Sequence, residues 1–581
     1  MVRRLTLAVL FITIATTALA APTITQIQDS VRPRSGRVAI EGAGFATGGT
    51  VYINGIASWT SSWQDTRVVA YVPEAAALGA TTLYVEVGSQ QSNTVPIEVT
   101  TREQVGRLKW QFETDGTNQW WRPALAPDGT IYIHSNNDYE GVVYALSPDG
   151  ALLWIQKVNW YPYVPPTAGP DGAVYVGSIG TVYRISPEGT IDWEYNPDGV
   201  NIEVSPTVGP DGRVYGAFEV SGAFALEPLT GEVVWENPGD PMITDQAGDA
   251  VEAVFGHLGP GQPPEQFYVS VDGGGSFHVF DFDGDQRYTT WLGNLKGTAE
   301  AAIGSDGTIY GPRAIGLTVV ALDPADGSLI WEYYPHDWAV GTNNVEIGPD
   351  DTLYFVGSAA KLEAFDPATQ QRIWQEWTQG HYLKRPTVTP DGSTLIVSGS
   401  DDNVYGGPGF VKAFNSADGT LLWQFDLPFE IVDDSFRVYG THHAKITPDG
   451  TTAYLSTFSL AEWPYDGDPH TIFFAFDISE TDCTSAEVTG VTHEADKVTL
   501  HWTPHGAGAT YDVSRGDLGD RGGGFGSSCM ASGISEPWYE DTDTPAGGSG
   551  YYYLVRATTD ECGTGPWGSD SAGGSRVAAC P

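Results

Sequence analysis

The sequence predicts an all-β protein in which an eight-bladed β-propeller lies between two β-sandwiches. Three observations lead to this prediction. The 581 residues include 71 Gly, 38 Pro, 28 Tyr and 19 Trp but only 3 Met, a composition typical of chains rich in turns and strands. A Trp recurs at intervals of 39 to 56 residues through the middle of the chain, which is the length of a four-stranded propeller blade. Short runs of alternating apolar and polar residues occupy both flanks.

The N-terminus has the pattern of a secretory signal peptide. Arg3 and Arg4 precede an apolar stretch over residues 5–15, and Ala18-Leu19-Ala20 forms an A-x-A ending. We therefore expect cleavage after Ala20 and a secreted protein, extracellular or periplasmic, that follows bacterial-type export. A membrane anchor is the weaker alternative, because the apolar core is short and no basic stop-transfer segment follows it. A lipoprotein is not expected, because no Cys lies near the cleavage point.

Residues 21–100 predict the first β-sandwich. Apolar and polar residues alternate at 38–40, 51–53, 67–72 and 82–87, and turn residues separate these runs at about ten-residue spacing. The segment resembles an IPT/TIG immunoglobulin-like domain, and the resemblance rests on Ile40–Phe45, Val51–Gly55, Val72-Pro73 and Ser92-Asn93. It implies spacing, presentation or binding at a cell surface.

Residues 101–482 contain an internal repeat. A Pro-Asp-Gly turn or a close variant falls between successive Trp residues, where Pro sets φ and Gly tolerates the positive φ of a tight hairpin. The strand that holds the first Trp is expected to complete the last blade, which otherwise ends near Asp477, and so to close the ring. The repeat Trp side chains are expected to pack between blades: Trp110, Trp154, Trp193, Trp235, Trp291, Trp331, Trp374 and Trp423.

A second hairpin precedes most of these Trp residues. Its pattern Ala-Leu-Asp-Pro-x-x-Gly-x-x-x-Trp stands at residues 321–331 and recurs with variation at 225–235, 364–374 and 413–423. This pattern resembles the tryptophan-docking repeat of pyrroloquinoline-quinone-type propellers, the quinoprotein-like family. The resemblance implies the fold far more than any activity, because function depends on the site and not on the fold.

Residues 483–581 predict a second sandwich, which resembles a fibronectin type III domain. Val498–Trp502 fits the strand with the core Trp, Tyr511–Arg515 fits the next strand, and Tyr551–Ala557 fits the penultimate strand. The glycine-rich run at residues 521–526 departs from that pattern.

The four cysteines all lie in this last segment, at Cys483, Cys529, Cys562 and Cys580. Their spacing contains no C-x-x-C, which disfavours a zinc site. We expect two disulfides that stabilise a small exported domain, and the sequence leaves the three possible pairings open.

Charge limits the possible partners. Acidic residues outnumber basic ones by 73 to 28, for a formal net charge of −45, and residues 101–482 carry −37 of it. Nucleic acids and anionic membranes require basic patches, so neither is an expected partner. No apolar run after the N-terminus is long enough to insert into a membrane. A solvated acidic surface is the default interpretation, and attraction of cations or basic partners is the alternative.

The candidate site is the mouth of the propeller channel. The loops that lead from the outer strand of one blade to the innermost strand of the next gather there, and propeller ligands usually bind there. Aromatic and hydrogen-bonding residues in these loops predict binding of an extracellular protein or glycan. The alternative is that such residues only face water in the channel. The candidates are Trp120, Trp121, Arg122, Trp160, Tyr161, Tyr163, Glu203, Glu300, Trp338, Asn344, His381, Lys384, Arg385, His442 and His443.

Two enzyme classes are the alternatives to a non-catalytic scaffold, and no catalytic residue is assigned. Quinone-dependent alcohol dehydrogenases typically use an adjacent Cys pair and a calcium held by Glu, Asn and Asp. This propeller has no Cys, and the calcium ligands have no matching positions, so pyrroloquinoline quinone is not an expected cofactor. A carbohydrate-active enzyme needs paired carboxylates, for which Glu203 and Glu300 are candidates two blades apart.

Calcium has one weak candidate site. Asp281, Asp283 and Asp285 have the alternating oxygen ligands that calcium prefers. The segment lacks a later acidic residue at the usual spacing and coincides with a repeat hairpin, so a degenerate turn is the favoured interpretation and no metal is predicted.

Overall fold

The computed structural model describes most of residues 21–581. The residues outside the description are 1–20, 103, 105–106, 117–121, 138–139, 160–161, 163, 198–201, 219–221, 238–253, 272–275, 292–300, 314–317, 335–342, 358–360, 379–382, 384, 401–408, 428–429, 433–434, 438, 442–443, 460–470, 480–487, 489–490, 494–497, 503–508, 518–526, 546–550, 560–562 and 565–581. The described part is all-β, as the composition predicts, and contains no helix that could cross a membrane. The predicted signal peptide lies outside it.

The described residues 21–101 form a compact unit with two sheets. One sheet has the order β1 (Thr23–Ile27), β3 (Arg37–Ala43), β7 (Arg67–Tyr71) and β6 (Thr60–Trp63). The other has the order β2 (Val31–Pro33), β10 (Val95–Thr100), β8 (Gly79–Val87), β4 (Thr50–Ile53) and β5 (Ile56–Ala57), with β9 (Gln90–Gln91) beside β8.

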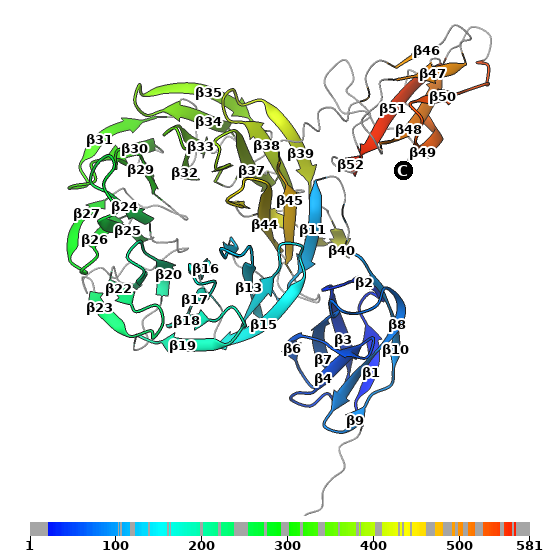
Figure 1. Cartoon of the computed structure of the whole chain (residues 1–581), viewed down its shortest axis with the longest axis horizontal. Helices are drawn as coiled ribbons and strands as arrows, with labels where there is room; N and C mark the ends of the chain where they lie inside the picture. Colours follow the sequence, from blue (N-terminus) through cyan, green and yellow to red (C-terminus); the bar gives the residue numbers. More distant parts are fainter. Residues whose placement is uncertain are drawn as a thin grey trace, which may run out of the picture. The chain divides into compact units, whose positions relative to one another are not determined.

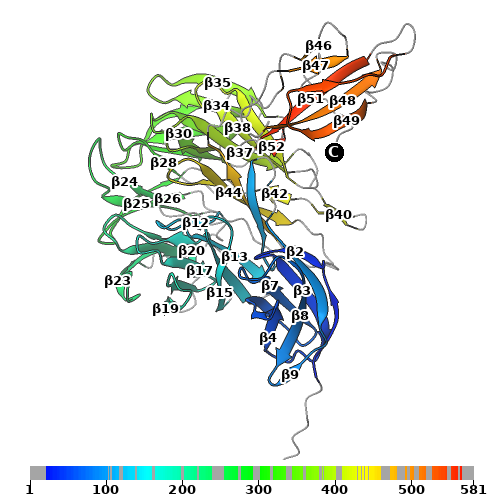
Figure 2. The ribbon, with the colours of Figure 1, turned by 45° about the vertical axis from the view of Figure 1, so that its right-hand side comes forward.

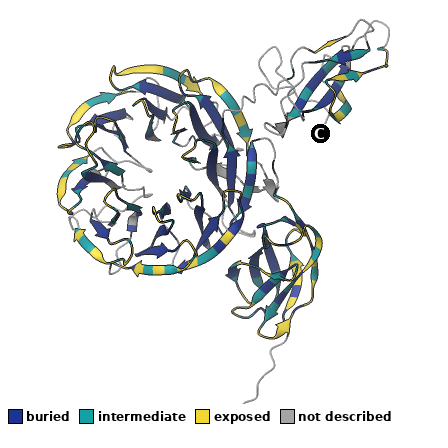
Figure 3. Ribbon diagram, viewed as in Figure 1, coloured by how far each residue is buried: buried dark blue, intermediate teal, exposed yellow. Residues whose placement is uncertain are grey.

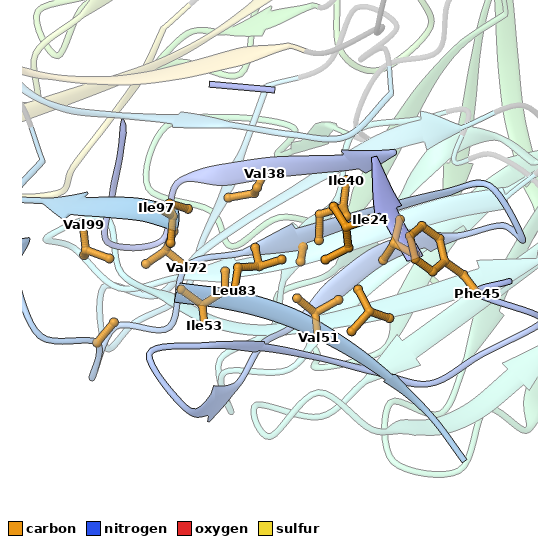
Figure 4. Close-up of a cluster of buried hydrophobic side chains, with 14 residues drawn as sticks. Ile24, Val38, Ile40, Phe45, Val51, Ile53, Val72, Leu83, Ile97 and Val99 are labelled. Carbon is orange, nitrogen blue, oxygen red and sulfur yellow. The ribbon is translucent and has the colours of Figure 1, made fainter. Parts of the chain in front are cut away.

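The core of this unit follows from the alternation in its strands. Val38 and Ile40 of one sheet and Val51 and Leu83 of the other are fully buried, and Figure 4 shows these side chains in one apolar cluster. Burying each such side chain stabilises the fold by roughly 1.5–3 kcal/mol. The N-terminal segment is therefore a two-sheet sandwich.

Eight sheets follow in the described residues from Leu108 to Asp477. Each is antiparallel, and in the first seven the strands run in chain order from the centre of the ring outward (Figures 1 and 2). Blade 1 comprises β12 (Ala124–Leu125), β13 (Ile131–Asn137), β14 (Glu140–Leu146) and β15 (Leu152–Asn159). Blade 2 comprises β16 (Thr167–Ala168), β17 (Val174–Ser178), β18 (Thr181–Ile185) and β19 (Ile191–Tyr195). Blade 3 comprises β20 (Ile202–Val208), β21 (Val214–Phe218), β22 (Ala223–Leu226) and β23 (Val233–Asn237).

The next four sheets continue the ring. Blade 4 comprises β24 (Val254–Gly256), β25 (Gln266–Val271), β26 (Ser276–Asp281) and β27 (Gln286–Trp291). Blade 5 comprises β28 (Ala302–Ile303), β29 (Ile309–Arg313), β30 (Thr318–Leu322) and β31 (Leu329–Tyr333). Blade 6 comprises β32 (Asn343–Ile347), β33 (Leu353–Gly357), β34 (Lys361–Asp366) and β35 (Gln371–Trp377). Blade 7 comprises β36 (Thr387–Val388), β37 (Thr394–Ser400), β38 (Gly409–Asn415) and β39 (Leu421–Asp426).

Blade 8 closes the ring with strands from both ends of the repeat region. It comprises β42 (Tyr439–Thr441), β43 (Lys445–Ile446), β44 (Thr452–Ser459) and β45 (Ile472–Asp477), and its outer strand is β11 (Leu108–Glu113). A small hairpin, β40 (Glu430–Val432) and β41 (Ser435–Arg437), precedes it in sequence. The antiparallel register places Leu108 opposite Phe476 and Glu113 opposite Ile472. The predicted closure through the Trp110 strand is confirmed.

Neighbouring blades are held together by docked indole rings. The Trp110 Nε1–H donates to the Pro148 carbonyl of the next blade at 2.9 Å, and Trp154 makes the same bond to Pro187 at 2.7 Å. The hairpin Gly lies under the ring: a Cβ at Gly150 would stand 2.6 Å from Trp110. Gly150 also has a φ of 80°, which favours glycine. The Pro and Gly of this hairpin therefore form the surface on which the preceding Trp docks.

Trp291 corrects one expectation of the repeat. The docking position of blade 4 is held by Tyr288, which pairs with Val279 as each docked Trp pairs with its own inner neighbour. The Tyr288 O–H donates to the Pro324 carbonyl at 2.9 Å. Trp291 lies three residues further along β27 and is 56% exposed, so it does not pack between blades. The docked residue stands four positions after the hairpin Gly, and counting from Gly284 gives Tyr288.

The C-terminal segment has two described sheets. One has the order β46 (Thr492–His493), β47 (Thr499–His501) and β50 (Trp538–Glu540). The other has the order β49 (Ser527–Ile534), β48 (Thr510–Asp517), β51 (Tyr551–Thr559) and β52 (Gly563–Thr564). Trp502 is buried and packs against Tyr511 at 5.3 Å between ring centroids. Cys529 in β49 is not a free thiol, and the other three cysteines lie outside the description.

Candidate functional site

The structure describes the side chains of two of the predicted mouth residues, Arg122 and Arg385. The backbones of Glu203 in β20 and Asn344 in β32 are also described, which places both on innermost strands. The remaining candidates lie outside the described residues: Trp120, Trp121, Trp160, Tyr161, Tyr163, Glu300, Trp338, His381, Lys384, His442 and His443.

Arg122 and Arg385 occupy equivalent places in two blades. Each stands two residues before an innermost strand, β12 or β36, and five residues before the Pro of the following turn. Glu346 in β32 and Lys445 in β43 stand three residues before the corresponding Pro in their own blades. Positions two apart on a strand share a face, and the innermost strands surround the centre of the ring (Figure 1). These four residues are called the axial cluster below.

A charge-assisted contact joins two members of the axial cluster. Nη2 and Nε of Arg385 lie 2.6 and 2.9 Å from Oε2 of Glu346, and the Val388 N–H donates to Oε1 at 3.3 Å. Both side chains are largely buried, at 13% and 15% exposed. The contact therefore links blade 6 to blade 7 and fixes the direction of the Arg385 guanidinium.

Cationic side chains of two further blades also act on the carboxylate of Glu346. Burial raises the pKa of Glu346 to about 7, while the Val388 N–H and the charges of Arg122 and Lys445 act in the opposite direction. Arg122 belongs to blade 1 and Lys445 to blade 8. Groups from four blades thus share one electrostatic environment near the ring axis. Such a set of cations can receive a carboxylate or another anionic group.

Sequence reasoning missed Glu346 and Lys445. It selected residues expected at the start of each innermost strand, whereas these two stand further along, three residues before the Pro of the turn. Aligning the blades on the Pro of the Pro-Asp-Gly turn would have found them, because every second residue before that Pro shares a face. Glu346 is the residue that brings the predicted Arg385 into a defined geometry.

Blade 1 contains a second buried polar group. His134 in β13 is 1% exposed, and its Nε2–H donates to the Val164 carbonyl at 3.2 Å. Its Nδ1 and both amide atoms of Asn136 have no hydrogen-bond partner. Complete burial lowers the pKa of His134 to about 4, because the imidazolium would lose its hydration. His134 is therefore neutral at physiological pH.

The weak calcium candidate forms a turn. Oδ1 of Asp281 accepts the backbone N–H groups of Asp283 and Asp285 at 3.1 and 2.9 Å, which closes the hairpin between β26 and β27. Among the residues that the structure describes, no three His, Cys, Asp or Glu side chains converge in a way that could hold a metal ion.

Comparison with known families assigns the propeller. The PQQ_2 family, described as outer membrane protein assembly factor BamB, matches residues 97–311 and 316–455. The chain belongs to this family. The matched residues cover nearly all of blades 1–7 and the first part of blade 8, so the propeller with quinoprotein-like repeats is confirmed as the fold of the middle region.

Curated relatives share a smaller part of the chain. It is 28% identical over 151 residues to the quinohemoprotein alcohol dehydrogenase ADH-IIG of Pseudomonas putida, covering 22% of this chain and 20% of that protein. It is 28% identical over 180 residues to the dehydrogenase subunit of the quinone alcohol dehydrogenase of Acetobacter aceti, covering 28% of this chain and 24% of that subunit. The chain thus spans about a quarter or less of the length of these relatives.

Two solved structures are similar to part of this chain. BamB from Moraxella catarrhalis is 13% identical, covers 63% of this chain and 98% of its own, and has a TM-score of 0.44. The C-terminal WD40 domain of Sif2 is 11% identical, covers 64% of this chain and 99% of its own, and has a TM-score of 0.47.

Proposed function

We propose that the protein is a secreted, non-catalytic binding scaffold that holds a protein or glycan ligand at the mouth of its propeller. The axial cluster carries this proposal, because two guanidinium groups and one ammonium group share the environment of Glu346. Cations in fixed positions recognise anionic groups through charge-assisted hydrogen bonds. The ligand is therefore expected to present a carboxylate or similar group to the cluster. The family description names an assembly factor, which supports a scaffold.

The flanking segments support presentation outside the cell. We infer that residues 1–20 are a signal peptide, that residues 21–100 are an IPT/TIG domain, and that residues 483–581 are a fibronectin type III-like domain with two disulfides. The two-sheet topology of each flank and the buried Trp502 support these assignments. Such modules space and orient a central binding domain.

A titration of the full chain tests the binding proposal. A disaccharide with one terminal galacturonate and an otherwise uncharged peptide with a free C-terminal carboxylate serve as glycan and protein probes, and isothermal calorimetry at low and high salt measures their affinity. We expect one probe to bind, with affinity that falls as salt screens the charges. Arg385→Met should weaken binding at least about tenfold, because one partner of a largely buried charge pair is lost.

Arg287 provides the matched control for that experiment. It is an exposed arginine on β27, on the outer strand of blade 4, so Arg287→Met removes the same charge away from the axis. Binding should be unchanged in this variant. Equal losses in the two variants, or no binding of either probe, would contradict the proposal.

A quinone-dependent oxidoreductase is the second candidate, and the matching alcohol dehydrogenases favour it. The axial cations fit the carboxylates of a tricarboxylate quinone. The described residues supply no carboxylate set for its metal, and residues 101–482 contain no Cys. The fit is therefore incomplete, and no reaction step is derived. A carbohydrate-active enzyme is the third candidate, and its paired carboxylates would be Glu203 and Glu300, whose side chains lie outside the description.

Quinone and calcium added to the full chain separate these functions. A bound ligand at a hundred times its dissociation constant would stabilise the fold by about 2.7 kcal/mol. A scaffold predicts no rise in melting temperature and no dye reduction with alcohols or aldose sugars. Quinone-dependent turnover would replace the scaffold by the oxidoreductase.

A further inference from the structure

Three adjacent blades expose an aromatic ring at one register of their outer strands. Each ring stands three residues after the aromatic side chain that docks on the next blade. The three residues, called the aromatic stripe below, are Trp291 in β27, Tyr334 directly after β31 and Trp377 in β35, with exposures of 56%, 55% and 70%. Figure 3 shows the outer strands of the ring as its exposed perimeter, and Figure 1 shows β27, β31 and β35 in succession along it.

The register explains why these rings remain exposed. Successive strand side chains point to opposite faces, so a residue three positions after a docked ring lies on the face away from the next blade. The other five blades have no aromatic residue at this position. Their residues there are Glu113, Lys157, Asn196, Pro238 and Asp426. The aromatic stripe is thus confined to blades 4, 5 and 6, while the docked aromatic position is filled in every blade.

Aliphatic residues on two of the same strands are also exposed, and together with the aromatic stripe they are called the patch below. Leu329 and Ile330 of β31 and Ile373 of β35 are 50%, 52% and 51% exposed. Aliphatic side chains are exposed on other outer strands as well, at Leu153, Val233 and Leu421. Single exposed apolar residues are ordinary, so the aromatic rings are the feature that distinguishes blades 4–6.

Charge identifies the class of partner that fits this patch. The strands β27, β31 and β35 together have no net charge, because two positive and two negative side chains balance: Arg287, Arg372, Glu332 and Glu376. Residues 101–482 as a whole have a net charge of −37. A second copy of this chain would bring a net charge of −45 and would be repelled, as would any polyanion. A basic partner would be drawn to the acidic remainder of the propeller. The neutral patch therefore fits an uncharged partner.

We propose that the aromatic stripe binds an uncharged polysaccharide chain laid across the outer strands of blades 4–6. Trp and Tyr rings are rigid, flat and apolar with a polar edge, which matches sugar rings that have an apolar face and hydroxyl edges. Three rings repeated on successive blades suit a ligand that is itself a linear repeat. Binding through several weak stacking contacts gains from their connection in one chain.

Affinity electrophoresis of the full chain in gels that contain hydroxyethylcellulose or glucomannan tests this proposal. The native chain should be retarded by at least one of these polymers, and salt should not change the retardation, because no charge is involved. Trp377→Ala should weaken the affinity at least about fivefold, as expected for the loss of one aromatic contact. Removing all three rings should abolish retardation.

Trp538 is the matched control, since it is 42% exposed on β50 of the C-terminal segment and lies outside the aromatic stripe. Trp538→Ala should bind as the native chain does. Circular dichroism should show both variants folded, because exposed side chains contribute little to stability. No retardation of the native chain, or equal loss in the control, would overturn the proposal. So would a change in sedimentation in place of polysaccharide binding, which would indicate self-association.

Discussion

Trp110→Ala tests whether β11 closes the ring through its docked indole. Trp110 is 2% exposed, its ring centroid lies 5.9 Å from those of Tyr454 and Phe473, and its Nε1–H bonds to the Pro148 carbonyl. Truncating a buried Trp to Ala costs about 3–5 kcal/mol. The lost hydrogen bond, worth about 1 kcal/mol, favours the upper half of that range.

Trp291→Ala is the matched comparison, because it makes the same substitution in the same domain at an exposed position. We expect it to change the free energy of unfolding by less than about 0.5 kcal/mol. Urea unfolding followed by far-ultraviolet circular dichroism measures both variants without depending on the missing indole. Equal losses would show that the docking register of blade 4 is wrong. A loss below about 1 kcal/mol for Trp110→Ala would show that β11 does not hold the ring closed.

Three further predictions concern acid stability, domain boundaries and thiols. The pKa of His134 is lowered from 6.5 to about 4, so its contribution to stability is complete above pH 6.5 and is lost as the pH falls toward 4. The free energy of unfolding should fall by about 3 kcal/mol across that range. This pH-dependent loss should be absent in His134→Gln when unfolding of both proteins is measured between about pH 7 and about pH 4. Removing residues 1–101 should leave the melting temperature of the propeller unchanged, whereas removing residues 1–111 should lower it by deleting most of β11; identical melting temperatures would contradict the closure. Titration of unfolded, unreduced protein should find essentially no free thiol, and two or more would contradict the predicted disulfides.

The repeat made the fold predictable in unusual detail because its parts depend on one another physically. A Pro-Asp-Gly turn, a hairpin Gly and a docked aromatic residue recur at fixed spacing, and closure follows from a first Trp that has no preceding blade. The prediction for Trp291 was wrong because it followed the residue type, Trp, and not the position four residues after the hairpin Gly. Tyr288 fills the docking position because its ring and hydroxyl reproduce both functions of an indole, namely packing and donation to a carbonyl.

The site was less predictable because it combines residues from different blades. Arg385 could be chosen from its place before an innermost strand, but its partner Glu346 belongs to another repeat unit, and no local pattern relates the two. The cost of burying the Glu346 carboxylate likewise depends on the assembled ring. The aromatic candidates of the mouth fall outside the described residues and stay predictions.

The pairing of β11 with β45 has a mechanical consequence. The chain enters the propeller at Leu108 and leaves it after Asp477, and the antiparallel register puts these two points at the same end of one ladder. Tension applied through the flanking segments would therefore peel the two strands apart one bond at a time and would not shear them. Arg107 stands at that end, where its Nη1 donates to the Asp477 carbonyl at 3.1 Å and its guanidinium lies 5.0 Å from the centroid of the Trp423 ring. This arginine would bear the first load, and its contacts set the force at which the ring begins to unzip.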